Sequence, residues 1–200
     1  MMRFHYAGKY VGPDQLPKRE PMPDGAVAFR EPDSAGMMGL IGNGLALVIF
    51  VVLYGLLVVR CGMGALNHEA FFFGALLTLA TMVPHEFIHA ICFRGDVYMY
   101  QALSKGLLFV VGPEDMTLGH FCFMSLLPAT VLGVIPYLAC MIAPSLTALG
   151  IFGAMALASA AGDFFNVFNA VTQMPRGALT FLSGFHSYWY LPESGKGPDA

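Results

Sequence analysis

The segment AFFFGALLTLATMVPHEFIHAICF, residues 70–93, decides the fold, because it is long and apolar yet contains ionisable side chains. It exceeds the roughly 20 residues that an α-helix needs to cross a membrane. Its ionisable side chains are those of His85, Glu86 and His89. Such groups are costly in lipid, so they normally face the interior of a helix bundle and mark a functional site. We therefore expect a membrane-spanning helix with a polar, functional inner face.

Three further segments of the chain are equally long and almost free of charge. The whole chain of 200 residues is 56% hydrophobic and 12% charged, which is about half the charge of a typical soluble domain. This pattern predicts an all-α integral membrane protein that has membrane lipid as its partner. Its four transmembrane helices are expected at about 37–59, 70–93, 118–143 and 145–172.

Composition also argues against two classes of protein. The net charge of -3, with 10 basic and 13 acidic residues, is unlike that of nucleic-acid-binding proteins. The cysteines are scattered through apolar sequence without a C-x-x-C pair, so neither a disulfide framework nor a thiolate zinc site is expected. These cysteines are Cys61, Cys92, Cys122 and Cys140.

Charged residues outside the four segments predict the orientation. Residues 1–36 form a polar, proline-rich arm and residues 173–200 a tail, and four spans place both on the same side as the 94–117 loop. All Lys and Arg residues except Arg60 lie on that side. Because basic residues mark the cytoplasmic face, we expect a multi-pass plasma-membrane protein with both termini in the cytoplasm.

Residues 85–89 read His-Glu-Phe-Ile-His, which is the H-E-x-x-H pattern. On a helix, residues four apart lie on the same face. The imidazoles of His85 and His89 can therefore bind one zinc ion, while Glu86 reaches a water molecule at the metal as the catalytic acid/base. Pro84 should kink this helix; it is either a tolerated transmembrane proline or a device that admits water.

Catalytic zinc takes three protein ligands, and Asp163 is the only other acidic residue inside a predicted span. His85 lies nine residues before Arg94, where its span ends, and Asp163 lies ten residues before Gln173. At about 1.5 Å per residue, the two side chains should lie at nearly the same depth, in the cytoplasmic half of the membrane. We therefore expect Asp163 to be the third ligand.

Polar side chains on the predicted second and fourth spans also form matching helical faces, and two polar faces in lipid should meet. Asn166 is a candidate to orient a metal ligand by hydrogen bonding, with Ser159 on the same face; a plain interhelical hydrogen bond is the alternative. The faces comprise Thr78, Thr81, His85, His89 and Cys92 on one span, and Ser159, Asp163, Asn166 and Gln173 on the other.

Other histidines compete for the third position. His120 lies at the inner end of the third predicted span and is a rival ligand, although an interfacial or capping role suits it better. His186 lies in the tail and is a weaker rival. His5 and His68 are expected to be ordinary surface residues, and His68 lies on the opposite side of the membrane.

The chain resembles a family of small membrane-integral bacterial proteins described as putative zincin peptidases, over roughly residues 70–190. The resemblance implies zinc bound by His85 and His89, Glu86 as acid/base, and Asp163, in a Gly-Asp pair, as third ligand. A more distant likeness is to site-2 proteases, whose aspartate stands in an Asp-Gly pair instead. The blocks that carry the resemblance are 85–89, 126–128, 132–136, 161–163 and 174–179.

These features favour a zinc-dependent membrane-embedded peptidase that cleaves a membrane or membrane-proximal protein. One alternative is a non-catalytic metal-binding membrane scaffold, although a structural site has no use for Glu86. A di-iron protein is the other, because Glu86 and His89 also form an E-x-x-H pair. Such sites need several inward-facing carboxylates, and the predicted spans supply only Glu86 and Asp163.

The 94–117 loop contains two β-prone runs, 97–103 and 107–111, separated by a turn that contains glycine. They predict a small β-hairpin at the cytoplasmic surface. This hairpin either pairs with an extended substrate by strand addition or simply covers the site.

Overall fold

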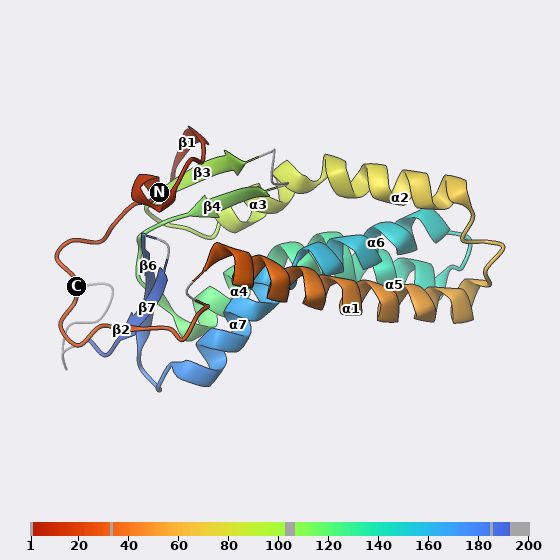
Figure 1. Cartoon of the computed structure of the whole chain (residues 1–200). Coiled ribbons are helices and arrows are strands. Elements are labelled where there is room, and N and C mark those ends of the chain that lie inside the picture. Colours follow the sequence, from red (N-terminus) through yellow and green to blue (C-terminus); the bar gives the residue numbers. More distant parts are fainter. Residues whose placement is uncertain (1, 33, 103–106, 185, 193–200) are drawn as a thin grey trace. The chain divides into compact units, whose positions relative to one another are not determined.

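The computed structural model describes residues 2–32, 34–102, 107–184 and 186–192, which form two compact units (Figure 1). We call them the sheet unit and the helix unit. The sheet unit comprises Met1–Glu31, Glu86–Ser125 and Asn166–Ala200, and the helix unit Pro32–His85 and Leu126–Phe165. Both units are therefore built from stretches that lie far apart in the sequence.

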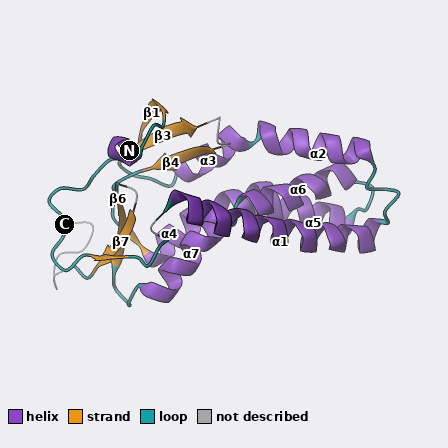
Figure 2. Ribbon diagram, viewed as in Figure 1, coloured by secondary structure: helices purple, strands orange, loops and turns teal. Residues whose placement is uncertain are grey.

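The prediction of an all-α fold is wrong, because the sheet unit contains two β-sheets (Figure 2). One has the strand order β1-β3-β4 and the other β2-β7-β6-β5. The protein is a mixed α/β protein. Its strands are β1 (Arg3–Lys9), β2 (Val27–Ala28), β3 (Asp96–Ala102), β4 (Leu107–Val111), β5 (Met116–Thr117), β6 (Leu179–Ser183) and β7 (His186–Tyr190).

Side-chain contacts from the N-terminal arm hold its strand in the first sheet. β1 pairs in parallel with β3, with Arg3 opposite Asp96. The guanidinium of Arg3 donates two hydrogen bonds to the Asp96 carboxylate, and the ring of His5 lies 2.8 Å from the same group. These bonds, chiefly that from Arg3, lower the pKa of Asp96 to about 2. His5 is exposed, as expected, but it helps to fix β1.

The hairpin expected in the 94–117 loop is present over its described residues. β3 pairs antiparallel with β4, from Tyr98 opposite Val111 to Ala102 opposite Leu107. The expected turn at residues 104–106 lies outside the described residues. In the strand order β1-β3-β4, β4 is an edge strand.

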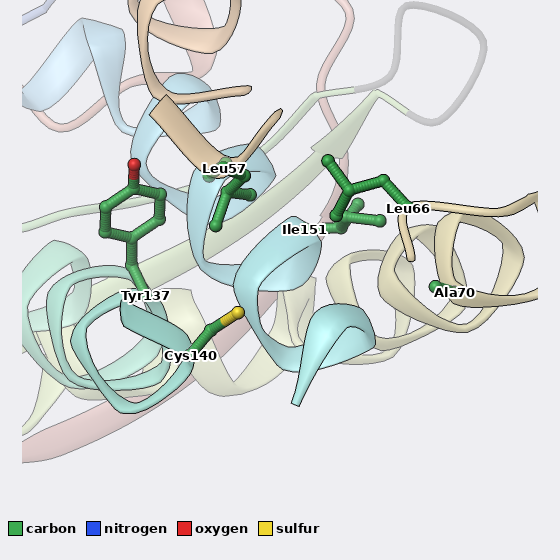
Figure 3. Close-up of a cluster of buried hydrophobic side chains, with 7 residues drawn as sticks. Leu57, Leu66, Ala70, Tyr137, Cys140 and Ile151 are labelled. Carbon is green, nitrogen blue, oxygen red and sulfur yellow. The ribbon is translucent and has the colours of Figure 1, made fainter. Parts of the chain in front are cut away.

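The helix unit contains the most apolar helices of the chain. Its buried core includes Leu57, Tyr137, Cys140 and Ile151 (Figure 3). The Tyr137 hydroxyl donates a hydrogen bond to the carbonyl of Leu53 at 2.9 Å. The helices that lie wholly in this unit are α1 (Ala35–Cys61), α2 (His68–Ala80), the π-helical segment η3 (Ala129–Val134), α5 (Ile135–Ile142) and α6 (Thr147–Ser159).

Glycines let these helices pack backbone to backbone. A Cβ atom added to Gly153 of α6 would lie 2.5 Å from the Tyr137 nitrogen and 2.7 Å from the Gly133 oxygen. A Cβ at Gly74 of α2 would lie 2.7 Å from Ile151. Close approach through small residues is typical of helices that associate in membranes.

Within the described residues, three helices are long and apolar enough to cross a membrane: Gly36–Cys61, His68–Ala90 and Leu118–Ile142. A fourth candidate is the pair Thr147–Ser159 and Ala161–Gln173, which is bent by 47°. These helices are compatible with a membrane protein. The first three correspond to the predicted spans, and the fourth predicted span is broken between α6 and α7 (Ala161–Gln173).

Candidate metal centre

Helix α3 (Met82–Ala90) carries the whole H-E-x-x-H pattern. A break at Thr81 separates α3 from α2. It lies three residues before Pro84, which has no N–H and therefore leaves a gap in the helical hydrogen bonds at this point. Glu86 and His89 are buried, with 9% and 6% of their surface exposed. Buried ionisable side chains need partners, and the structure supplies one for each of them.

Asp163 lies beside His85, as the depth argument predicts. Asp163 is in the first turn of α7, and its Oδ2 atom lies 3.3 Å from Nε2 of His85. Both side chains are mostly buried. The break between Ser159 of α6 and Ala161 of α7 places Asp163 near a helix start, where a negative charge is favoured by the helix dipole.

His85, His89 and Asp163 together offer three ligand atoms that all lie within 4.8 Å of one another. In a tetrahedral zinc site with ligand distances of about 2.0–2.2 Å, ligand atoms lie roughly 3.4 Å apart. Two imidazoles and a carboxylate are a donor set that zinc accepts in catalytic sites, with one position left for water. The three residues therefore fit a zinc ion after small side-chain movements.

A backbone carbonyl orients His89. Its Nδ1 atom lies 2.9 Å from the carbonyl oxygen of Met124. A carbonyl can only accept, so Nδ1 carries the proton and Nε2 keeps its lone pair. This is the usual arrangement of a histidine that binds a metal through Nε2.

The edge strand β4 orients Glu86. The backbone N–H of Val110 donates a hydrogen bond of 3.0 Å to Oε2 of Glu86. Val110 could not be identified from the sequence, because it contributes a backbone group that no side-chain pattern reveals. The predicted hairpin beside the motif was the only available signal.

Ser159 and Asn166 are the residues expected to support a metal ligand, and the structure places them as follows. The Ser159 hydroxyl donates to the carbonyl of Ala156 at 2.9 Å, a bond within its own helix. Asn166 lies half-buried on α7, three residues after Asp163. Gln173, on the same predicted polar face, donates to Oδ1 of Asn169 at 3.1 Å.

The rival histidines lie outside the three-residue group. Nε2 of His120 is 2.8 Å from the carbonyl oxygen of Cys92. Nδ1 of His186 is 3.6 Å from the carboxylate of Glu31. His68 is exposed at the start of α2. The geometry therefore favours Asp163 over all three as the partner of the two α3 histidines.

One known family matches the part of the chain that contains the candidate site. Residues 78–179 match the sequence model of a family described as putative zincin peptidases. The chain belongs to this family. The matched region includes all three candidate ligands and Glu86, and the family description implies zinc as the metal. No curated protein and no solved structure matches the chain.

Proposed function

We propose that this member of the zincin peptidase family is a zinc-dependent, membrane-embedded peptidase that hydrolyses a peptide bond of a membrane or membrane-proximal protein. The observation that carries the proposal is the convergence of His85, His89 and Asp163 within 4.8 Å. Glu86, the neighbour of His85 on α3, supplies the acid/base group that a purely structural site would not need.

The chain's own residues account for the proton transfers. His85, His89 and Asp163 would hold the zinc ion, which when bound would polarise the scissile carbonyl and make a water molecule easier to deprotonate. Glu86 takes the proton from the attacking water and passes it to the leaving amine. The Val110 N–H donates a hydrogen bond to Oε2 of the Glu86 carboxylate and so helps to hold this group in position. The Met124 carbonyl keeps His89 in the tautomer that binds metal.

The edge of β4 suits the presentation of an extended substrate. In an antiparallel pair, hydrogen-bonding groups alternate between the partner strand and the free edge. Because the Val110 N–H donates to Glu86, the backbone groups of Val110 and Leu108 face away from β3. A helical substrate hides its peptide bonds, so it must be extended before cleavage. An extended segment that pairs with Leu108 on β4 would lie beside Glu86.

Replacing Val110 by proline tests the role of β4. Proline is tolerated on an edge strand where the N–H points away from the sheet, so Val110→Pro should preserve the fold but lose the bond to Glu86. We expect peptide hydrolysis to fall about tenfold or more, which corresponds to a lost hydrogen bond to a charged group. Phe109→Pro removes an N–H that faces β3 and should disrupt the hairpin, as circular dichroism would show. Full activity of Val110→Pro would contradict the role.

The proposal includes an orientation in the membrane. Arg60 is the only basic residue on one side of the predicted topology, so we place both termini in the cytoplasm of a plasma-membrane protein. His85 and Asp163 then lie in the cytoplasmic half of the membrane, at the depth that the sequence predicts.

Metal analysis of the purified protein tests the site. We expect about one zinc per wild-type chain and loss of zinc in Asp163→Ala. Asp24→Ala is the matched control, because Asp24 is exposed in the N-terminal arm and its loss should leave the zinc content unchanged. Size-exclusion profiles establish that each variant is folded. Wild-type protein that takes up no zinc, or Asp163→Ala that retains it fully, would rule out this ligand set.

A further inference from the structure

Two cysteines of the helix unit lie in contact near the C-terminal ends of α1 and α5. Cys61 is the last residue of α1 and Cys140 lies in α5, 79 residues later, yet their sulfur atoms are 3.8 Å apart. Sequence spacing gives no sign of this pair. The contact lies within one compact unit and is distinct from the metal centre, which α3 and α7 form.

The surroundings hold the two thiols in place. Cys140 is fully buried in the core of Figure 3, and a Cβ atom at Gly150 would lie only 2.6 Å from its sulfur. Beside the pair, the Arg60 side chain donates a 2.8 Å hydrogen bond to the carbonyl of Met141. The C-terminal ends of α1 and α5 are therefore joined at two adjacent points, and the buried Cys140 sulfur has little room to move.

In the orientation proposed above, the pair lies near the outer side of the membrane. Cys61 immediately precedes the loop between α1 and α2, which the distribution of basic residues assigns to the side opposite the cytoplasm. Disulfides form and persist in compartments on that side of a membrane and are rare in the cytosol.

We propose that Cys61 and Cys140 form a disulfide in the mature protein. Cys61 is partly exposed, so its thiolate attacks the disulfide of an external thiol oxidase and forms a mixed disulfide. The Cys140 thiolate then attacks the Cys61 sulfur and releases the oxidase as a dithiol. The two cysteines lose two protons and two electrons, and the oxidase disulfide gains them.

The bond would join a segment that lies outside the family match to one that lies inside it. Cys61 precedes the family match at residues 78–179, whereas Cys140 lies inside it. The disulfide would therefore fasten α1 covalently to the helices that the family shares. This inference does not depend on peptidase activity.

Counting free thiols in protein trapped directly from cells tests the disulfide. Cells are quenched in acid, and the full-length chain is alkylated in denaturant before and after reduction. Mass spectrometry should find two alkylated cysteines, Cys92 and Cys122, before reduction and all four afterwards. Four alkylated cysteines before reduction would overturn the proposal.

Matched variants separate this bond from other oxidation products. Cys61→Ser should show three alkylated cysteines both before and after reduction, whereas Cys92→Ser should show one before and three after. A variant that lacks Cys92 and Cys122 should run as a monomer on a non-reducing gel. A disulfide-linked dimer of that variant would mean that the two sulfurs pair between chains, and it would overturn the intramolecular bond.

Discussion

Replacing Glu86 by glutamine should abolish peptide hydrolysis while zinc remains bound. The glutamine side chain has the same shape, and its carbonyl oxygen can still accept the N–H of Val110, which holds Glu86 at 3.0 Å. It cannot take a proton from water, however. General acid/base groups contribute about 100- to 10,000-fold to a rate. We expect a loss at the upper end of this range, because in the proposed mechanism Glu86 takes part in both proton transfers.

The measurement compares cleavage of a dye-labelled unfolded protein by purified wild type and variant in detergent micelles, with zinc content determined on the same samples. Glu69→Gln is the control, since Glu69 is exposed at the start of α2 and its replacement removes the same charge. Undiminished cleavage by Glu86→Gln would exclude the mechanism. Wild-type protein that holds zinc but cleaves no better than Glu86→Gln would identify a non-catalytic scaffold.

Replacing Gly153 by alanine should strongly destabilise the helix unit. The added methyl group would lie 2.5 Å from the backbone nitrogen of Tyr137 and 2.7 Å from the carbonyl oxygen of Gly133. Both obstacles are backbone atoms, so no side chain can rotate away and α6 must move from its neighbours. Overpacking of this kind lowers the free energy of unfolding by about 1–3 kcal/mol. We expect a loss at the upper end of this range, because the clash is with backbone atoms.

Thermal unfolding in detergent, followed by the loss of helical circular dichroism, measures this effect. Gly42→Ala is the matched control, because a Cβ atom at this position in α1 would meet nothing within 4 Å. Its unfolding temperature should stay unchanged or rise, since alanine is the better helix former. Equal unfolding temperatures for Gly153→Ala and wild type would contradict the packing described for α6.

The apolar helices and the proximity of the three candidate ligands could be predicted because their signals are largely local. Long apolar runs mark the helices, and helical spacing places His85 above His89. Counting residues to the ends of two spans was enough to pair His85 with Asp163, at 3.3 Å in the structure. The position of Val110 against Glu86 could not be predicted, because it depends on where a hairpin lies and involves only a backbone group.

Apart from the β3–β4 hairpin, the strands of the two sheets could not be predicted, because they depend on partners that are distant in the sequence. Nearly all of β1 is exposed, so it has no alternation of buried and exposed residues. It becomes a strand by pairing with β3, more than 90 residues later. β2 has only two residues, and its partner β7 lies near the other end of the described chain.

The pairing of β1 with β3 also has a consequence for the order of folding. β1 leaves the ribosome before β3, which emerges only after α1, α2 and α3 have been synthesised. Contacts between such distant residues form late. The second sheet can form only later still, because β2 pairs with β7. The hairpin strand that contacts Glu86 thus belongs to a sheet unit that is completed only after β7 has been synthesised, so a nascent chain would carry His85, His89 and Asp163 before that unit is complete.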